Sequence, residues 1–135
     1  MSDQNARIIA EFHENHGKVG GPFVGKPILL LHHKGARTGT ERVNPLMYQT
    51  LDGGFAVFAS KGGAPTNPGW YYNLRANPAV QIEIGDETFD VRARVVESDE
   101  REPIWDQQKR DYPQFAEYEQ KTKRKIPVVV LVRSG

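Results

Sequence analysis

Apolar and polar residues follow two different periods along this chain, and the periods separate predicted strands from predicted helices. Short alternating or continuous apolar runs are typical of β-strands. Six such runs are present, at Pro27–His33, Val43–Leu51, Phe55–Ala59, Val80–Ile84, Phe89–Val95 and Ile126–Val132. The third and the last run are apolar throughout, so we expect these two strands to be covered on both faces.

Four further stretches combine apolar residues at helical spacing with helix-start or helix-stop residues. These predicted helices are Ser2–His16, Asn67–Ala76, Ser98–Tyr112 and Gln114–Lys123. Ser2 and Asn67 are residue types that cap helix N-termini, and Pro68 suits the first helical position. The first helix has few apolar residues and can hold only by docking on another element. We therefore expect residues 1–22 to form a helix and linker that can act as a mobile flap.

Turn signals join most of these strands in pairs. Asp52-Gly53 and Gly85-Asp86 are typical of tight hairpin turns. We predict a mainly β, α+β fold, in which about six mostly antiparallel strands form a small closed or partly open barrel with flanking helices. Helix Asn67–Ala76 lies between two hairpins rather than in a strand-helix alternation, which argues against a doubly wound fold. With 135 residues, the chain is expected to be a single domain spanning residues 1–135.

Composition narrows the function further. Lys and Arg number 18 against 17 Asp and Glu, a formal net charge of +1, so there is no general electrostatic case for nucleic acid binding. The absence of cysteine excludes disulfides and thiolate ligands. No stretch approaches the roughly 20 apolar residues of a membrane span, and the N-terminus lacks a signal-peptide pattern. We expect a cytoplasmic protein, and leave open its oligomeric state and a peripheral membrane contact through Ile8, Ile9 and Phe12.

The first candidate site is the stretch Lys34–Pro45, K-G-A-R-T-G-T-E-R-V-N-P, which follows an apolar strand. Its glycines permit a tight turn and the close approach of a ligand, and its arginines carry planar charged groups suited to phosphate or carboxylate. The residues that such a turn can bring together on an anion are Arg37, Thr38, Gly39, Thr40 and Arg42. The alternative is a solvated hairpin loop whose arginines touch nothing.

A second glycine-rich stretch, S-K-G-G-A-P-T, begins at Ser60 and Lys61 and leads into the helix that carries Trp70 and Tyr71. A helix N-terminus offers free amides and positive dipole character to an anion, and an indole can cover a flat ring. Together the two stretches suit a planar cofactor with a phosphate tail, which would supply the reactivity itself. The alternative is that these aromatic residues pack the helix on the sheet. We favour packing for Leu74 and ring contact for Trp70.

Other kinds of chemistry lack support. His32 and His33 are adjacent on a strand and point to opposite faces, so they cannot share one metal ion, and we expect no metal site. We interpret His33 as a side chain at the loop edge. The acidic residues form no suggestive pair for hydrolysis, and the phosphate-binding and dinucleotide-binding glycine motifs are absent. We also find no convincing nucleophilic triad.

Three segments resemble the deazaflavin-dependent nitroreductase family of actinobacteria. They are G-A-R-T-G-T-E-R-V-N-P-L (Gly35–Leu46), A-S-K-G-G-A-P-T-N-P-G-W-Y-Y-N-L-R-A-N-P (Ala59–Pro78) and K-I-P-V-V-V-L (Lys125–Leu131). In order and spacing the resemblance covers nearly all of Pro27–Arg133. It implies a split β-barrel that binds coenzyme F420, an 8-hydroxy-5-deazaflavin with a phospholactyl-polyglutamate tail. It also implies hydride transfer from the reduced cofactor to quinone or nitroaromatic acceptors.

The resemblance implies roles for residues in both glycine-rich stretches. The first stretch would hold the tail phosphate and nearby groups, although the family usually has Lys where Arg37 stands. Ser60 and Lys61 would contact the deazaflavin or the adjoining tail. The ring and its ribityl arm would be lined by Pro45, Trp70, Tyr71 and Asn73.

The acceptor side of the resemblance is apolar enough for a quinone ring. Its residues are Met47, Tyr112, Phe115 and Tyr118. Nitroimidazole-active relatives place tyrosines in this pocket, and Phe115 lacks the hydroxyl expected there. We expect no obligatory nucleophile, with Tyr118 or water as proton donor. The alternatives are a carrier that binds F420 without turnover, or a barrel that binds FMN or haem.

Overall fold

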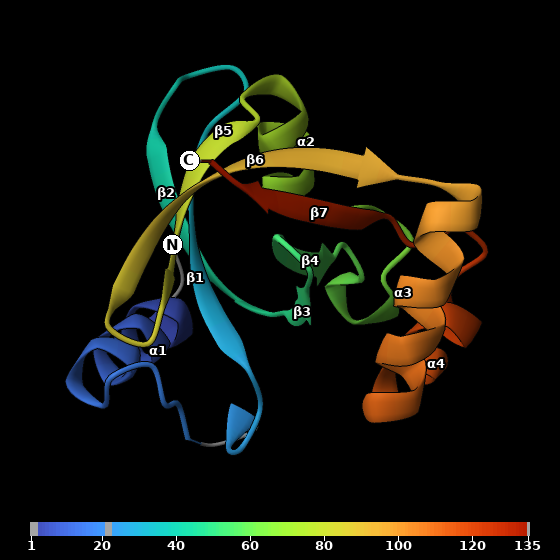
Figure 1. Cartoon of the computed structure of the whole chain (residues 1–135), viewed down its shortest axis with the longest axis horizontal. Helices are drawn as coiled ribbons and strands as arrows, with labels where there is room; N and C mark the ends of the chain where they lie inside the picture. Colours follow the sequence, from blue (N-terminus) through green and yellow to red (C-terminus); the bar gives the residue numbers. More distant parts are fainter. Residues whose placement is uncertain (1–2, 21–22, 135) are drawn as a thin grey trace.

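The computed structural model describes residues 3–20 and 23–134, and its centre is one curled, seven-stranded sheet (Figure 1). The strand order is β2-β1-β5-β6-β7-β4-β3, and every neighbouring pair is antiparallel. The strands are β1 (Ile28–Lys34), β2 (Glu41–Met47), β3 (Gln49–Leu51), β4 (Gly54–Phe58), β5 (Ala79–Ile84), β6 (Glu87–Val96) and β7 (Val128–Arg133). The predicted α+β fold with antiparallel strands is therefore confirmed.

The prediction of one strand over Val43–Leu51 is wrong, because the chain changes pairing partners at Tyr48. Residues before Tyr48 form β2 on β1, and residues after it form β3 on β4. These two strands are the opposite edges of the sheet, so the curled sheet brings its edges together where the chain crosses between them. This closure gives the split-barrel shape and leaves little open edge. Pro45 lies in the edge strand β2, where a missing N–H is tolerated.

One face of the sheet is covered by helices α1 (Asp3–Glu14), α3 (Ser98–Asp111) and α4 (Gln114–Lys121). Alternate residues of each strand point to this face, as the pleat requires. The buried cluster includes Phe12, Ile28, Leu30, Phe58, Trp105, Phe115 and Val128. The apolar residues of all three helices therefore share one core.

The opposite face is covered by α2 (Gly69–Ala76). Its Trp70, Tyr71 and Leu74 pack on a second buried cluster that includes Leu29 and Leu31 of β1. The continuous apolar character of the central strands is explained by this double coverage, as predicted for the third and last strands.

The predicted capping of α2 by Asn67 is wrong. The helix starts at Gly69, its N-cap residue is Pro68, and no side chain caps it. The Asn67 amide oxygen is instead taken by the guanidinium of Arg124, at 2.6 Å. The predicted cap at Ser2 and the linker residues 21 and 22 lie outside the described residues.

Helix α1 is docked on the β5–β6 hairpin by histidine–carboxylate contacts. Glu83 meets His13 at 3.0 Å and His32 at 2.6 Å, and His16 lies 2.8 Å from Asp86. Burial raises the pKa of Glu83, but the hydrogen bonds from the two histidines outweigh it, so the pKa is lowered overall. The helix is thus held at its polar end as well as through its apolar side.

The apolar side of α1 is used inside the molecule. Phe12 is fully buried, and Ile8 and Ile9 pack against the same cluster. No helix in the described part of the chain is long and apolar enough to cross a bilayer. The peripheral membrane contact and the cytoplasmic location stay predictions.

Candidate functional site

The first loop, residues 35–40, connects β1 to β2 and is closed by its own hydrogen bonds. The Gly35 amide donates to the carbonyl of Thr40, and the Gly39 amide to that of Gly35, both at 2.9 Å. Gly39 has φ +71°, which favours glycine. Arg37 and Arg42 are exposed, and neither side chain has a hydrogen bond or an ion pair with any described residue. The loop and the adjoining start of β2 therefore present two unpaired guanidinium groups, those of Arg37 and Arg42, on a defined backbone.

A buried histidine ties this loop to α2. The Ala36 amide donates to Asn73 Oδ1 at 2.9 Å, and Asn73 Nδ2 lies 3.0 Å from His33 Nδ1. The interpretation of His33 as a loop-edge side chain is wrong, because its ring is only 4% exposed and faces α2. Burial lowers the pKa of His33, against the hydrogen bond to Asn44. The ring is therefore held neutral near pH 7.

The second loop, residues 60–67, has an unusual backbone. Lys61, Gly62 and Gly63 have φ of +48°, +64° and +86° in succession. A left-handed lysine is strained, and strain of this kind is concentrated at functional sites. Lys61 is exposed and reaches only Thr66 Oγ1 at 3.4 Å, whereas Ser60 is buried. The loop thus turns a cation outward.

Gly63 brings the second loop against α4. A Cβ atom at this position would lie 3.0 Å from the Tyr118 carbonyl oxygen and 2.9 Å from Lys121 Cβ. Only glycine combines this close approach with the positive φ. The second loop and the backbone of Tyr118 are therefore in direct contact.

Arg124 holds the second loop from the other side, and the sequence analysis missed it. Its guanidinium donates to the carbonyls of Ala59, Ser60 and Ala64 and to Asn67 Oδ1, at 3.1, 3.0, 3.0 and 2.6 Å. In the sequence it is one cation in a basic segment that reads as solvent-exposed. Only the fold distinguishes it from its neighbours.

The residues predicted to line a flat ring are less accessible than expected. Trp70 and Tyr71 are only 6% and 8% exposed, because both pack between α2 and the sheet. Asn73 is half-buried, and its amide is engaged by Ala36 and His33. Pro45 is half-buried on β2. These residues therefore have little exposed surface with which to contact a ligand.

The four predicted acceptor residues lie together in and beside the first core cluster. The Phe115 and Tyr118 rings are 5.3 Å apart, while Met47 and Phe115 are mostly buried. Burial raises the pKa of Tyr48, and the charge interaction with the nearby Tyr112 raises it further. Tyr112 and Tyr118 are the half-buried hydroxyl groups of the set.

Gln114 connects two members of this set, although no sequence pattern pointed to it. Its Nε2 lies 3.3 Å from the Tyr118 oxygen and 3.9 Å from Met47 Sδ, and its Oε1 accepts from Lys26 Nζ at 3.0 Å. The Tyr118 oxygen therefore accepts from Gln114, which leaves the hydroxyl proton to be donated elsewhere.

These local groups form one connected region. The first loop is bonded to α2, α2 follows directly from the second loop, and the second loop touches α4. A groove of about 900 Å³ lies beside the first loop, and of the predicted site residues only Thr40 and Arg42 line it. No group of three potential metal ligands occurs among the residues that the structure describes.

Comparison with known proteins gives the class and then the family. The chain is 38% identical over 128 residues to an F420H2-dependent quinone reductase of Mycobacterium tuberculosis, covering 92% of this chain and 86% of that protein. A solved F420H2-dependent reductase matches with a TM-score of 0.71 and 44% identity, covering 78% of this chain and 93% of that one. A solved domain-swapped dimer matches with a TM-score of 0.73 and 41% identity, covering 93% and 96%.

These similarities define an F420-dependent oxidoreductase of split-barrel fold. The sequence model of the F420H2-dependent quinone reductase family matches residues 5–133, so the chain belongs to that family. The predictions of an enzyme, of F420 as cofactor and of quinone as acceptor are confirmed. The F420 carrier and the FMN- or haem-binding barrel are thereby disfavoured. Activity on nitroaromatic compounds stays a prediction.

Arg124 gives a first test of how the second loop is held. Arg124→Lys keeps the charge but removes the planar fork, so the three backbone carbonyls lose most of their donors. We expect the Kd for F420 to rise about tenfold, since one or two net hydrogen bonds are lost. Fluorescence titration measures the affinity, and Lys123→Arg serves as a neighbouring exposed control. Equal affinities for Arg124→Lys and wild type would show that the fork is not needed.

Proposed function

We propose that the two glycine-rich loops and α2 hold coenzyme F420 in this chain. The first loop would bind the tail phosphate through Arg37, Thr38, Gly39, Thr40 and Arg42. The supporting observation is that both guanidinium groups are exposed and unpaired among the described residues, Arg37 on the loop that is bonded to α2 and Arg42 on the adjoining β2. Such groups fit a phosphate, which they can bind bidentately.

The second loop would carry the ring end of the cofactor. Lys61 turns outward from a strained backbone, and Ser60 lies at the base of the loop. Trp70, Tyr71, Asn73 and Pro45 would shape the wall from behind, since the first two are buried and the other two half-buried. The proposed seat therefore depends on loop geometry more than on an exposed aromatic face.

The acceptor would bind beside the second loop, where Met47, Tyr112, Phe115 and Tyr118 gather. Contact between Gly63 and the Tyr118 backbone supports this placement. Apolar residues suit a quinone ring. A nitroaromatic acceptor would have one hydroxyl fewer to bond than in a pocket with tyrosine at this position, because residue 115 is phenylalanine. We therefore expect slower turnover of nitroaromatic acceptors than of quinones.

Reduced F420 supplies the hydride, and the chain supplies position and a proton. The chain would raise the rate mainly by holding the donor and the acceptor in position for hydride transfer. Gln114 directs the Tyr118 hydroxyl by donating to its oxygen. Tyr118 can then give its proton to the reduced acceptor, with water restoring it.

Tyr118→Phe tests this assignment. We expect kcat with menadione to fall about tenfold, less than the roughly 10²–10⁴-fold usual for general acid catalysis because water can partly replace the hydroxyl, while the Kd for F420 stays unchanged. The measurement is the oxidation of F420H2 followed by its absorbance. Tyr72→Phe is the matched control, because Tyr72 is an exposed tyrosine on the outer side of α2.

Two outcomes separate the proposals. An unchanged kcat in Tyr118→Phe would remove Tyr118 from the reaction and leave water as the donor. Wild-type protein that binds F420H2 but does not speed its oxidation by menadione would argue for a carrier. Repeating the assay with a nitroaromatic acceptor measures the expected preference for quinone.

A further inference from the structure

Four groups form a directed chain of hydrogen bonds behind the first loop. The Ala36 N–H can only donate, and it donates to Asn73 Oδ1 at 2.9 Å. Asn73 Nδ2 must then donate to His33 Nδ1 at 3.0 Å, and His33 Nε2 donates to Asn44 Oδ1 at 2.7 Å. Each group therefore fixes the orientation of the next, and His33 is the neutral tautomer with its proton on Nε2.

The surroundings of His33 favour this neutral form. The ring is 4% exposed, and Arg42 is its partner in the β1–β2 pairing. Arg42 and the neighbouring His32 both disfavour a second positive charge there. The ring can therefore act as an acceptor toward α2 while it donates toward β2.

The fold does not depend on this series of hydrogen bonds to hold α2 and the first loop in place. Helix α2 is already packed on β1 through Trp70, Leu74 and Leu31, and the first loop closes on itself through the bond from Gly35 to Thr40. What these hydrogen bonds add is a fixed distance between Ala36, which precedes Arg37, and helix α2, which follows the second loop.

We infer that His33, with Asn73, is a positioning residue for the cofactor: it sets the spacing between the phosphate-binding loop and the ring-binding elements. This inference rests on the proposed function of the two loops. Because His33 is buried, it acts through Asn73 and Ala36 rather than by touching the ligand. A ligand that spans both loops depends on this spacing, whereas a ligand bound at one of them does not.

The test compares intact F420 with a tail-free deazaflavin that has the same ring and ribityl chain. In His33→Leu we expect the Kd for F420 to rise about tenfold, as for a lost buried hydrogen-bond network. The Kd for the tail-free compound should change less than about twofold, below the fold-change of one typical hydrogen bond. A merely structural loss would weaken both compounds alike and would overturn the inference. His32→Leu is the matched control, since His32 is the preceding residue of the same strand, points to its opposite face and contacts Glu83 of β5.

Two further measurements keep the outcomes distinct. NMR of the imidazole nitrogens in the wild-type protein needs no variant and should find the proton of His33 on Nε2. A proton on Nδ1 would contradict the direction of the hydrogen bonds described above. Binding of F420 to Arg37→Ala/Arg42→Ala protein tests the proposed function separately. If the double variant binds F420 normally, the proposed site fails. If the double variant binds F420 weakly but His33→Leu binds it with the wild-type Kd, the positioning role alone fails.

Discussion

Arg37→Ala/Arg42→Ala protein is expected to bind oxidised F420 about 100-fold more weakly than wild type, or worse. A hydrogen bond to a charged group is worth about 1.5–3 kcal/mol, and each 1.4 kcal/mol is a factor of ten in affinity. Arg37 on the first loop and Arg42 on the adjoining β2 are unpaired among the described residues, so no internal hydrogen bond or ion pair is lost when they are removed. The free energy of unfolding should therefore change little, and fluorescence titration reports binding alone.

The control removes the same charge elsewhere. Arg7 and Arg92 are exposed on α1 and β6, and Arg7→Ala/Arg92→Ala lowers the net charge equally without touching the first loop. Wild-type affinity should also fall with ionic strength, since an exposed phosphate contact is screened, and the loop variant should have lost most of that dependence. Normal F420 binding by the loop variant would exclude the first loop as the phosphate site.

The strand pattern was predictable because buried faces impose a period of two. The break at Tyr48 was not, since Val43–Leu51 keeps one continuous pattern while its two halves pair with opposite edges of the sheet. Pairing partners are set by the curl of the whole sheet. A single run of residues carries no information about that curl.

The exposed part of the candidate site was predictable, and the internal supports were not. Glycine and arginine in a short loop indicate a turn and a charge whatever surrounds them, so the exposed positions of Arg37 and Lys61 could be predicted from the sequence. His33, Gln114 and Arg124 act through partners distant in the chain. Their roles depend on burial, which the helices on each face decide.

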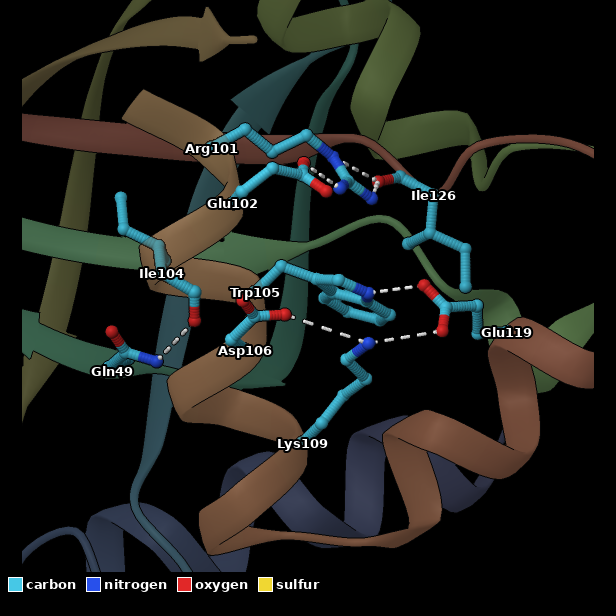
Figure 2. A network of polar contacts seen from close by, with 9 residues as sticks. All are labelled: Gln49, Arg101, Glu102, Ile104, Trp105, Asp106, Lys109, Glu119 and Ile126. Atoms are coloured by element: carbon cyan, nitrogen blue, oxygen red, sulfur yellow. Dashed lines mark hydrogen bonds and ion pairs between the residues drawn. The ribbon is translucent and has the colours of Figure 1, made fainter. Parts of the chain in front are cut away.

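The second large effect concerns the helices behind the acceptor residues. Figure 2 shows Trp105 at the centre of the polar network between α3 and α4. Its Nε1 donates to Glu119 Oε2 at 2.5 Å, and Lys109 bonds the other Glu119 oxygen at 3.1 Å. Burial raises the pKa of Glu119, but these bonds outweigh it and the pKa is lowered. Arg101, buried beside the indole, donates to the Ile126 carbonyl at 2.7 Å.

Trp105→Ala should lower the free energy of unfolding by about 3–5 kcal/mol, the cost of removing a buried aromatic residue. The indole is 1% exposed and meets the rings of Phe58 and Phe115 at 5.8 and 6.2 Å. A small domain has only about 5–15 kcal/mol of stability in total, so the loss should be large in urea unfolding. Trp105→Phe keeps most of the packing and is expected to lose less.

Trp105→Ala should affect acceptor binding and cofactor binding to different extents. Phe115 packs on both Trp105 and Tyr118, so a cavity at residue 105 loosens the acceptor side. Helix α2, to which the first loop is hydrogen-bonded, packs on the other face of the sheet. We therefore expect the KM for menadione to rise by a larger factor than the Kd for F420, since of the proposed cofactor elements only the second loop contacts α4; both are measured well below the unfolding midpoint. If F420 affinity fell in parallel with acceptor affinity, the two faces would not act independently, and the acceptor could not be assigned to the Tyr118 side alone.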